Sequence, residues 1–477
     1  MKILKIIAVL FLMMPFSHVL AQDVLRISPD EAVERAIKNN LSLESSRLAV
    51  STKKRASDVS WNQFVPSITA GGSLVVNNER SKISGTVPID LSTFVPALPA
   101  NTVFGNSAAY SAEGPQWNLA IPIQASLTLT VAMFENMNRL KLDYQGGLIA
   151  YEKAKLQLER DIRKAYNNML LLQENISLLK DNYENAARRV QMAQANYNAG
   201  LSPELVYLQT RVAMENMKPV IDQAENGYRL SLANFAMYLG LPYDTEFELI
   251  PLESPASNEN VINFIPLDVK ELIKKAASGK PDIQELRHNL LMLQSVRKIQ
   301  ANSLLPYLNF NYGFTPYYTP PFDIMGTRRN GEWGKSGSLT ITLGIRLHSL
   351  FPFSSDYQGI KDMDDQIKDI NIILAQVIQG TEIEIYNTIL SLNRIQITAE
   401  TQLQTITLAE RSYRLTDQAY RSGLQDFLQV QNAELELKQA KVSMLEQQFN
   451  YLNGLLDLEY SIGVPYGTLV QNSSKEN

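Results

Sequence analysis

YNAGLSPELVYLQ, residues 197–209, and YRSGLQDFLQVQN, residues 420–432, interrupt two long helical patterns with the same Tyr-x-x-Gly-Leu motif. Gly200 and Gly423 suit the position just past a helix end, where the backbone often needs a positive φ that glycine adopts freely. A second helical pattern follows each motif. Each stretch therefore predicts the tip of a helical hairpin: residues 198–203 and residues 421–426.

The residues that follow each glycine carry helix-start signals. Ser202-Pro203-Glu204 predicts a helix with Ser202 as its N-cap and Pro203 at its first position. Asp426 is the corresponding N-cap candidate in the second copy. A glycine is needed for such a turn whatever the protein does, so a function for the tips has to come from other observations.

The first helical pattern is unusually long. Phe134 to Asn198 contains no proline, and its apolar residues recur at alternating spacings of four and three. Such a 3.5-residue repeat keeps one apolar seam against a partner helix and predicts a left-handed coiled coil, about 95 Å long at about 1.5 Å per residue. The predicted seam consists of Leu158, Ile162, Ala165, Met169, Leu172, Ile176, Leu179, Tyr183, Ala186, Val190, Ala193 and Tyr197.

The second long pattern, from Ser354 to Arg421, is also free of proline, but its seam is less apolar. Glu410 and Asp417 stand where a closed two-helix seam requires apolar groups, because burying an unpaired carboxylate is unfavourable. Two interpretations are open. The seam shifts its register at these residues, or this edge of the helix faces water in a lumen.

Landmarks along the chain occur twice in the same order, which predicts an internal duplication. Asp30–Leu43 parallels Asp268–Ile283, and the order of the later landmarks is kept while the spacers change. The predicted organisation is a signal peptide at 1–21, a first repeat at 22–242, a linker at 243–266, a second repeat at 267–466 and a polar tail at 467–477.

Each half also contains two stretches in which apolar and polar residues alternate. WNLAIPIQASLTLTV, residues 117–131, is the longest of them. A period of two gives a strand one apolar and one polar face. Strands are predicted at about 67–77, 117–131, 307–315 and 337–348. The loops between them, Asn77–Gln116 and Thr315–Gly337, carry aromatic residues that suit a membrane-interface girdle: Tyr110, Tyr317, Tyr318, Phe322 and Trp333.

Alternating strands of about ten residues are typical of outer-membrane β-barrels, although a half-buried soluble sheet has the same pattern. Four strands cannot close a barrel, and an open edge leaves backbone groups unpaired in hydrocarbon. The chain must then oligomerise. A dimer would give eight strands around a filled interior, whereas a trimer would give twelve strands that can continue into a ring of helices.

The N-terminus predicts export. Lys2 and Lys5 precede an apolar run that is too short to span a membrane, and Val19-Leu20-Ala21 is a small-residue cleavage pattern. Cleavage after Ala21 leaves 456 of the 477 residues and changes the net charge from -5 to -7. An acidic exported protein is a poor candidate for binding nucleic acid. The chain has no cysteine, which excludes disulfides and a lipid-bearing cysteine.

Patterns that carry chemistry are sparse. Only His288 and His348 remain after cleavage, and no metal-ligand spacing or phosphate-binding glycine loop is present. Ser51-x-x-Lys54 has the spacing of a nucleophile pair but lies in a helical run without the companion motifs. The sequence therefore predicts no enzyme, no metal and no cofactor. A structural coiled-coil surface protein remains the alternative, and it explains the helices but not the strands.

Several of these features together resemble the outer-membrane efflux channel family, the TolC-like outer membrane factors. They are SPDEAVERAIKNN near the N-terminus, Pro66 and Pro306 before strands, the two Tyr-x-x-Gly-Leu tips, Leu-Gly-Leu-Pro at 239–242 and Ile-Gly-Val-Pro at 462–465. The match covers nearly the whole mature chain. It implies an α+β homotrimer whose twelve-stranded outer-membrane β-barrel continues into a long periplasmic α-helical barrel, with a small mixed belt near residues 243–266 and the tail.

The resemblance also implies a function. The family forms passive exit ducts of tripartite efflux or type I secretion systems. An inner-membrane pump of RND or ABC type drives transport, and a periplasmic adaptor joins pump and duct at the hairpin tips. The implied periplasmic gate residues are Tyr197, Tyr420, Gln425, Asp426, Gln429 and Asn432. The implied adaptor-docking residues are Gly200, Leu201, Gly423 and Leu424.

The gate departs from the family pattern. Related channels carry acids six and nine places after the second tip glycine and a basic residue two places after it, where this chain has Gln429, Asn432 and Gln425. Asp426 and Glu204 lie nearby and are candidates to replace the missing acids. We expect a mouth with weak cation preference, closed by packing and neutral hydrogen bonds. The cargo, whether drug, metal ion or protein, is not encoded in these motifs.

Overall fold

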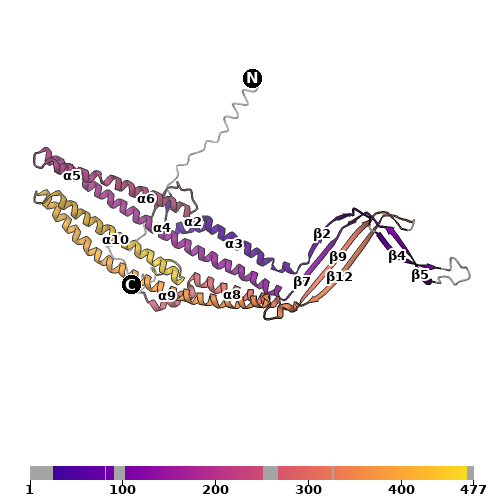
Figure 1. The fold of residues 1–477 in the computed structure, drawn as a ribbon. Helices are drawn as coiled ribbons and strands as arrows, with labels where there is room; N and C mark the ends of the chain where they lie inside the picture. The colour runs from indigo at the N-terminus through magenta and orange to yellow at the C-terminus, as the bar shows by residue number, and fades with distance from the viewer. Residues whose placement is uncertain (1–24, 81, 91–102, 251–266, 325–326, 470–477) are drawn as a thin grey trace, which may run out of the picture. The chain divides into compact units, whose positions relative to one another are not determined.

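A computed structural model describes residues 25–80, 82–90, 103–250, 267–324 and 327–469 (Figure 1). The predicted signal peptide, most of the predicted linker and the end of the polar tail lie outside these residues. The chain divides into two compact units. The first contains residues 1–52, 145–289 and 370–477, and the second contains residues 53–144 and 290–369. Within the described ranges, no helix has both the length and the apolar character needed to cross a membrane.

Two helical hairpins dominate the first unit (Figure 1). Helices α4 (Ala132–Asn198), α5 (Glu204–Glu215) and α6 (Met217–Tyr238) make one, and α9 (Ser355–Arg421) and α10 (Phe427–Ile462) make the other. Helices α4 and α9 have 67 residues each. Because Pro219 has no N–H to bond the carbonyl of Glu215, the helix after the first tip is divided into α5 and α6.

The seam predicted for the first long helix matches the buried face of α4. Six of its members are buried there: Ile162, Met169, Ile176, Leu179, Ala186 and Ala193. On α9 the buried position near the tip is Ala409 rather than Glu410. The Glu410 carboxylate instead pairs with Lys441 of α10 at 3.0 Å. Glu410 therefore lies beside the buried face of α9, and Asp417 pairs with Arg421 of the same helix at 2.8 Å.

Shorter helices and strands accompany the hairpins. Helix α2 (Pro29–Asn39) begins with a capping box between Ser28 and Glu31, and α3 (Leu41–Asp58) follows it. Strand β1 (Leu25–Ile27) pairs in parallel with β8 (Phe247–Leu249). The segment predicted as the linker, 243–266, thus contains the short, half-buried strand β8 among its described residues.

The core of the first unit lies in two clusters. Tyr166, Phe235 and Ile27 belong to one, and the Tyr166 hydroxyl lies 2.9 Å from the Ile27 carbonyl oxygen. Helix α7 (Val269–Gly279) packs against α9 and α10 in the other cluster, and α8 (Pro281–Asn302) follows it.

A glycine after each hairpin allows close backbone packing. Gly240 has a φ of 69°, and a Cβ there would lie 2.3 Å from the carbonyl oxygen of Asn39. Gly463 has a φ of 70°, and its Cβ would lie 2.1 Å from the carbonyl oxygen of Gly279. A side chain at either position would force apart the end of α2 or of α7.

The beginning of the predicted polar tail is held in place by hydrogen bonds. The buried carboxylate of Glu459 accepts hydrogen bonds from the N–H groups of Gly467 and Leu469, at 2.9 and 2.8 Å. Burial raises the pKa of Glu459, and these two hydrogen bonds oppose that increase.

The second unit contains an antiparallel sheet. Its strands are β2 (Ser67–Ala70), β3 (Ser73–Val76), β6 (Trp117–Ala120), β7 (Ile123–Leu129), β9 (Tyr307–Thr319) and β12 (Glu332–Gly344). Strand β9 lies between β12 on one side and β6 and β7 on the other, which pair in turn with β3 and β2. The sheet thus has four adjacent antiparallel paths in the described residues: β2 with β3, β6 with β7, β9, and β12.

The strand limits differ from the predicted ones. Breaks at Gly71-Gly72 and at Ile121-Pro122 divide two of the predicted strands. The predicted strand at 337–348 begins earlier, at Glu332, and ends at Gly344, after which a 3₁₀ helix forms at Leu347–Leu350. Both predicted loops contain strands. Strand β4 (Lys82–Asp90) pairs with β5 (Val103–Glu113), and β10 (Phe322–Ile324) pairs with β11 (Thr327–Arg329).

The predicted girdle aromatics lie on strands rather than in loops. Tyr317 and Tyr318 belong to β9 and Trp333 to β12. The Tyr318 ring lies between two tryptophans, with centroids 5.7 Å from Trp117 and 5.5 Å from Trp333. Phe322 lies in β10 and Tyr110 in β5.

The apolar face of the sheet is exposed in the single chain. Leu339, Ile341 and Leu343 of β12 retain 65%, 57% and 74% of their accessible surface. Covering this row of apolar side chains would be favourable, yet no described residue of the single chain covers it.

Candidate functional site

The first tip is a tight, hydrogen-bonded reversal. Helix α4 ends at Asn198, and Gly200 has a φ of 71°. The N–H of Gly200 donates to the Tyr197 carbonyl at 2.9 Å, and that of Leu201 donates to the Asn196 carbonyl at 2.8 Å. This is the Schellman pattern, which satisfies the last carbonyls of a helix. The N-cap of α5 is Pro203 without a side-chain bond, so the prediction of Ser202 as N-cap was wrong.

The second tip repeats this geometry. Helix α9 ends at Arg421, and Gly423 has a φ of 72°. The N–H of Leu424 donates to the Ala419 carbonyl at 2.8 Å. Asp426 is the N-cap of α10, because its carboxylate accepts the N–H of Gln429 at 3.0 Å. The carboxylate of Asp426 is therefore already engaged in starting a helix.

Each tip presents one apolar side chain to solvent. Leu201 and Leu424 are each 79% exposed, although the hydrophobic effect favours covering a leucine. They hold the same place in two turns of the same geometry. The tips therefore present a matched pair of exposed apolar side chains.

The predicted gate tyrosines pack within their own hairpins. Tyr197 stacks on Tyr207 of α5 with centroids 6.3 Å apart and planes nearly parallel. Tyr420 lies 6.3 Å from the ring of Phe427 in a tilted arrangement. Burial raises the pKa of Tyr420, partly offset by the positive charge of Arg189. Its hydroxyl therefore stays protonated throughout the neutral pH range.

The polar residues predicted for the gate share one property, exposure. Gln425, Asp426, Gln429 and Asn432 all lie on the exposed surface of this chain. Gln429 and Asn432 are three residues apart on α10 and thus on neighbouring positions of one helix face. The structure brings them together with the second tip, while Tyr197 belongs to the first.

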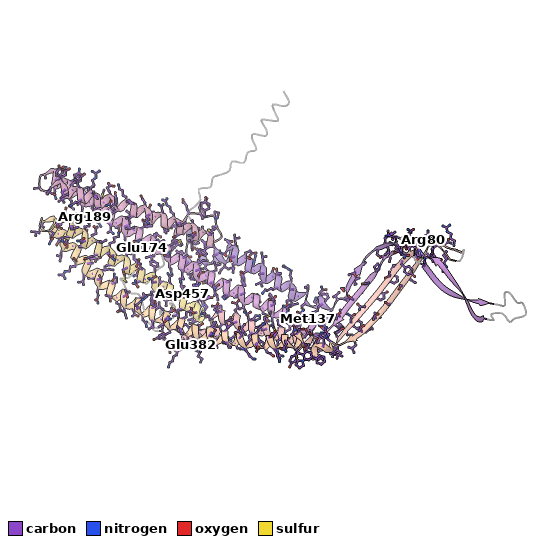
Figure 2. The ribbon with its side chains drawn as sticks, in the orientation of Figure 1. Arg80, Met137, Glu174, Arg189, Glu382 and Asp457 are labelled. Carbon is purple, nitrogen blue, oxygen red and sulfur yellow. The ribbon has the colours of Figure 1, made fainter. Side chains whose placement is uncertain are left out.

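A charged cluster behind the tips was missed by the sequence reasoning. Arg189 of α4 donates through Nη2 to a carboxylate oxygen of Glu434 on α10. Its Nη1 donates to the hydroxyl of Tyr413 on α9 at 3.2 Å. A signal was present in the sequence, because Arg189 precedes Gly200 by eleven residues and Glu434 follows Gly423 by eleven. Figure 2 shows Arg189 toward the tip end of its hairpin.

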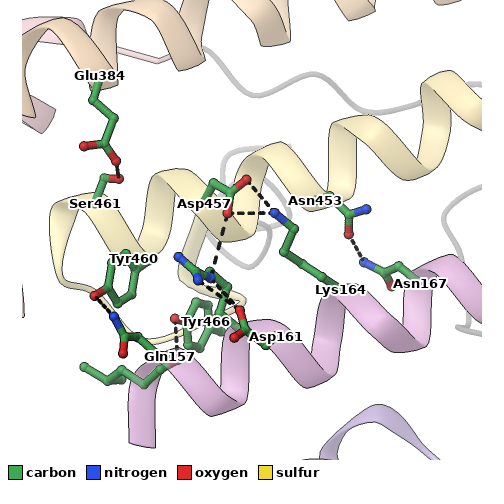
Figure 3. Close-up of polar contacts among 12 residues, drawn as sticks. Gln157, Asp161, Lys164, Asn167, Glu384, Asn453, Asp457, Tyr460, Ser461 and Tyr466 are labelled. Atoms are coloured by element: carbon green, nitrogen blue, oxygen red, sulfur yellow. Dashed lines mark hydrogen bonds and ion pairs between the residues drawn. The ribbon is translucent and has the colours of Figure 1, made fainter. Parts of the chain in front are cut away.

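Further from the tips, other polar contacts join α4 to α10 (Figure 3). Lys164 pairs with Asp457 at 2.8 Å, and the side-chain amide of Asn167 donates to that of Asn453 at 3.0 Å. Lys164 and Asp457 keep 35% and 42% of their side-chain surface, in contrast to the more buried Arg189 and Glu434. Asp457 also pairs with Arg160 of α4 at 4.0 Å, so the ion pairs that join α4 to α10 differ in burial along the hairpins.

Groups suited to chemistry do not gather in this region. Among the described residues, no three His, Cys, Asp or Glu side chains come together as a possible metal site. The tips instead combine exposed leucines, neutral amides and tightly turned backbone.

Comparison with known proteins gives a family match along most of the chain. The family model described as outer membrane efflux protein matches residues 32–241 and 272–464. Nodulation protein T of Rhizobium leguminosarum bv. trifolii is 18% identical over 441 residues, which cover 90% of this chain and 85% of that protein.

Solved structures of low sequence identity share the fold. CusC, described in terms of transmembrane channel formation, has a TM-score of 0.66 at 14% identity, covering 94% of this chain and 96% of that one. The CmeC outer membrane channel of Campylobacter jejuni has a TM-score of 0.65 at 15% identity, covering 94% of this chain and 89% of that one.

Proposed function

This chain belongs to the outer membrane efflux protein family, and on that premise we propose that it is the exit duct of a tripartite efflux or type I secretion system. Its function is that of an outer-membrane efflux channel. The duct is passive, so transport is driven by an inner-membrane pump that a periplasmic adaptor joins to it. The alternative reading, a structural coiled-coil surface protein, gains no support from the family match.

The proposed duct is a homotrimer. The sheet contributes four antiparallel paths, and its β12 side and its β2–β3 side have no further strand within the described residues. Unpaired strand edges are not tolerated in a bilayer, so the sheet has to close with other copies. Three copies give a twelve-stranded barrel, and the exposed row Leu339, Ile341 and Leu343 suits its lipid face.

We also propose that the chain arose by an internal duplication. The family match falls into two segments that correspond to the two predicted repeats. A close backbone contact also recurs in each half, since Gly240 packs on Asn39 and Gly463 packs on Gly279. Two copies of one ancestral unit would give both halves this contact. We retain a cleaved signal peptide at 1–21 as part of the proposal, because the outer membrane is reached by export.

The tips form the proposed periplasmic mouth. Gly200, Leu201, Gly423 and Leu424 would dock the adaptor. Tyr197, Tyr420, Gln425, Asp426, Gln429 and Asn432 would line the gate. Neutral amides at Gln425, Gln429 and Asn432 favour a mouth with weak cation preference. The pump, of RND or ABC type, and the cargo are to be identified through the genes that accompany this one.

The observation that supports the docking role is the matched exposure of Leu201 and Leu424. Changing both to Asp places a charge where an apolar contact is expected, and burying an unpaired charge is unfavourable. We expect Leu201→Asp with Leu424→Asp to abolish export of a fluorescent efflux dye in cells that carry the cognate adaptor and pump, while the complex still assembles in the outer membrane.

A matched control keeps the same positions apolar. Leu201→Met with Leu424→Met conserves hydrophobic character, so dye export should stay close to that of the wild type. If export persists with both leucines changed to Asp, the adaptor docks elsewhere on the chain.

A further inference from the structure

A buried ion pair joins the two hairpins of one chain behind their tips. The side chains of Arg189 and Glu434 retain only 6% and 15% of their accessible surface. Arg189 contacts both helices of the second hairpin, since it also donates to Tyr413 of α9 at 3.2 Å. Each of the pair lies eleven residues from its tip glycine, about 16 Å along a helix at about 1.5 Å per residue.

This cluster is incompletely satisfied. Arg189 Nε and Glu434 Oε1 are buried, yet neither has a hydrogen-bond partner among the described residues. Buried ion pairs generally add stability only when every donor and acceptor is matched, and apolar residues of similar volume often serve as well. Stability alone therefore does not explain a charged pair at this position. A contact that has to separate and form again would explain it, because both groups can be hydrated once apart.

A cavity beside the pair gives room for that separation. It has a volume of about 170 Å³ and is lined by Arg189 and Glu434 together with residues of both hairpins, including Thr210, Met217 and Lys438. The charged groups stand at the edge of this space, which is large enough for several water molecules to reach them as they part. The hairpins can then move without leaving a dry, unpaired charge between them.

We propose that Arg189, Glu434 and Tyr413 form a latch that holds the two hairpins of each chain together and limits how far the mouth opens. These are positioning residues, because they act through the hairpins and not on the transported cargo. The inference rests on the proposed channel function and assigns a role to residues outside the predicted gate. It adds a charge-assisted contact to a mouth whose rim carries neutral amides.

The latch is tested by recording from the full-length complex in planar lipid bilayers. Glu434→Gln and Arg189→Gln keep nearly the same shape but remove one charge. Each should raise the fraction of time spent in open states by roughly fivefold or more, in line with typical coupling between sites. Tyr413→Phe removes a single hydrogen bond and should give a smaller increase. The exchange Arg189→Glu with Glu434→Arg should restore most of the closed behaviour.

Two matched controls separate the latch from general charge effects. Arg188 is the neighbour of Arg189 on α4, but it is exposed and bonds only Asn185 of its own helix. Arg188→Gln should therefore leave the open fraction unchanged. Lys441 pairs with Glu410 inside the second hairpin, so Lys441→Gln should also have no effect.

A second measurement does not depend on conduction. The chain has no native cysteine, so spin labels can be placed at Asn198→Cys and Ser422→Cys alone. Mixing labelled chains with an excess of unlabelled chains gives complexes in which the measured distance is that between the two tips of one chain. Adding Glu434→Gln should lengthen and broaden that distance distribution, whereas Arg188→Gln should not.

The outcomes are distinct. Unchanged open fraction and unchanged tip distances in both Glu434→Gln and Arg189→Gln, even with reduced thermal stability, would show that the pair is only structural. A wild-type complex that never conducts would contradict the channel function, and the tip distances would still decide the latch.

Discussion

At the residue scale, the tip glycines are required by backbone geometry. Gly200 and Gly423 have φ values of 71° and 72°, and the Leu201 and Leu424 amides close the turns. A Cβ at either glycine would meet no atom within 4 Å, so any penalty comes from the backbone alone. Gly200→Ala and Gly423→Ala should each cost about 1–2 kcal/mol and reduce hydrogen-exchange protection of the following leucine amide.

Gly227 is the matched control for this prediction. It lies within α6, and a Cβ there also meets nothing within 4 Å, but its φ is not positive. Gly227→Ala should therefore stabilise the protein by about 0.5–1 kcal/mol. Protection of Leu201 that is unchanged in Gly200→Ala would show that the turn does not need this glycine.

The neutral rim of the mouth leads to a prediction about ions. Carboxylate rings in a narrow neck would concentrate multivalent cations, whereas Gln429 and Asn432 carry no charge. Micromolar trivalent cations added from the periplasmic side should therefore block single-channel current only weakly. Conductance should also vary little between pH 5 and 8, because amides do not titrate and the raised pKa of Tyr420 keeps its hydroxyl protonated. Strong block that Asp426→Asn relieves would mean that Asp426 restores the acidic ring.

Residue-scale reasoning from the sequence found the tip glycines and leucines, because a helix end with a positive φ leaves a local motif. It missed Arg189, which stands next to an apolar seam position and has its partners on two other helices. The equal spacing of Arg189 and Glu434 from their tip glycines was the one signal in the sequence, and it gained meaning only from the packing of the hairpins.

At the element scale, two of the ion pairs between α4 and α10, Lys164–Asp457 and Arg189–Glu434, differ in burial and can be compared directly. Double-mutant cycles on Lys164 and Asp457, both more than a third exposed, should give a coupling of about 0.2–1 kcal/mol in the free energy of unfolding. The Arg189–Glu434 cycle should give a larger coupling. Glu434→Gln alone should lower the free energy of unfolding by about 3–5 kcal/mol if the site neither rearranges nor takes up water. Equal couplings at the two sites would contradict the difference in burial.

The helices were easier to predict than the strands. An apolar repeat maintained across α4 identifies its buried face, whereas strand ends depend on their partners. Strand β12 ends at Gly344 because its partner residue is Tyr307, the first of β9, and Pro306 before it has no N–H to extend the ladder. The β4–β5 pair was missed because its small and polar residues do not alternate clearly with apolar ones.

At the scale of the whole molecule, the chain has surfaces that only an assembly would use. The sheet lacks neighbours on both sides within the described residues, and its apolar row is exposed. The sequence already predicted that the chain oligomerises, because its four predicted strands cannot close a barrel on their own. It could not identify the contacts between copies, because those depend on surfaces that no local motif marks.

The mass of the complex extracted from the outer membrane in detergent tests the central claim most directly. Native mass spectrometry should give three copies of the mature chain, because three sets of four strand paths close a twelve-stranded barrel that can carry solutes. A monomer or a dimer as the only species would contradict the account, since one set cannot close a sheet in the bilayer and two sets would form a barrel filled by side chains.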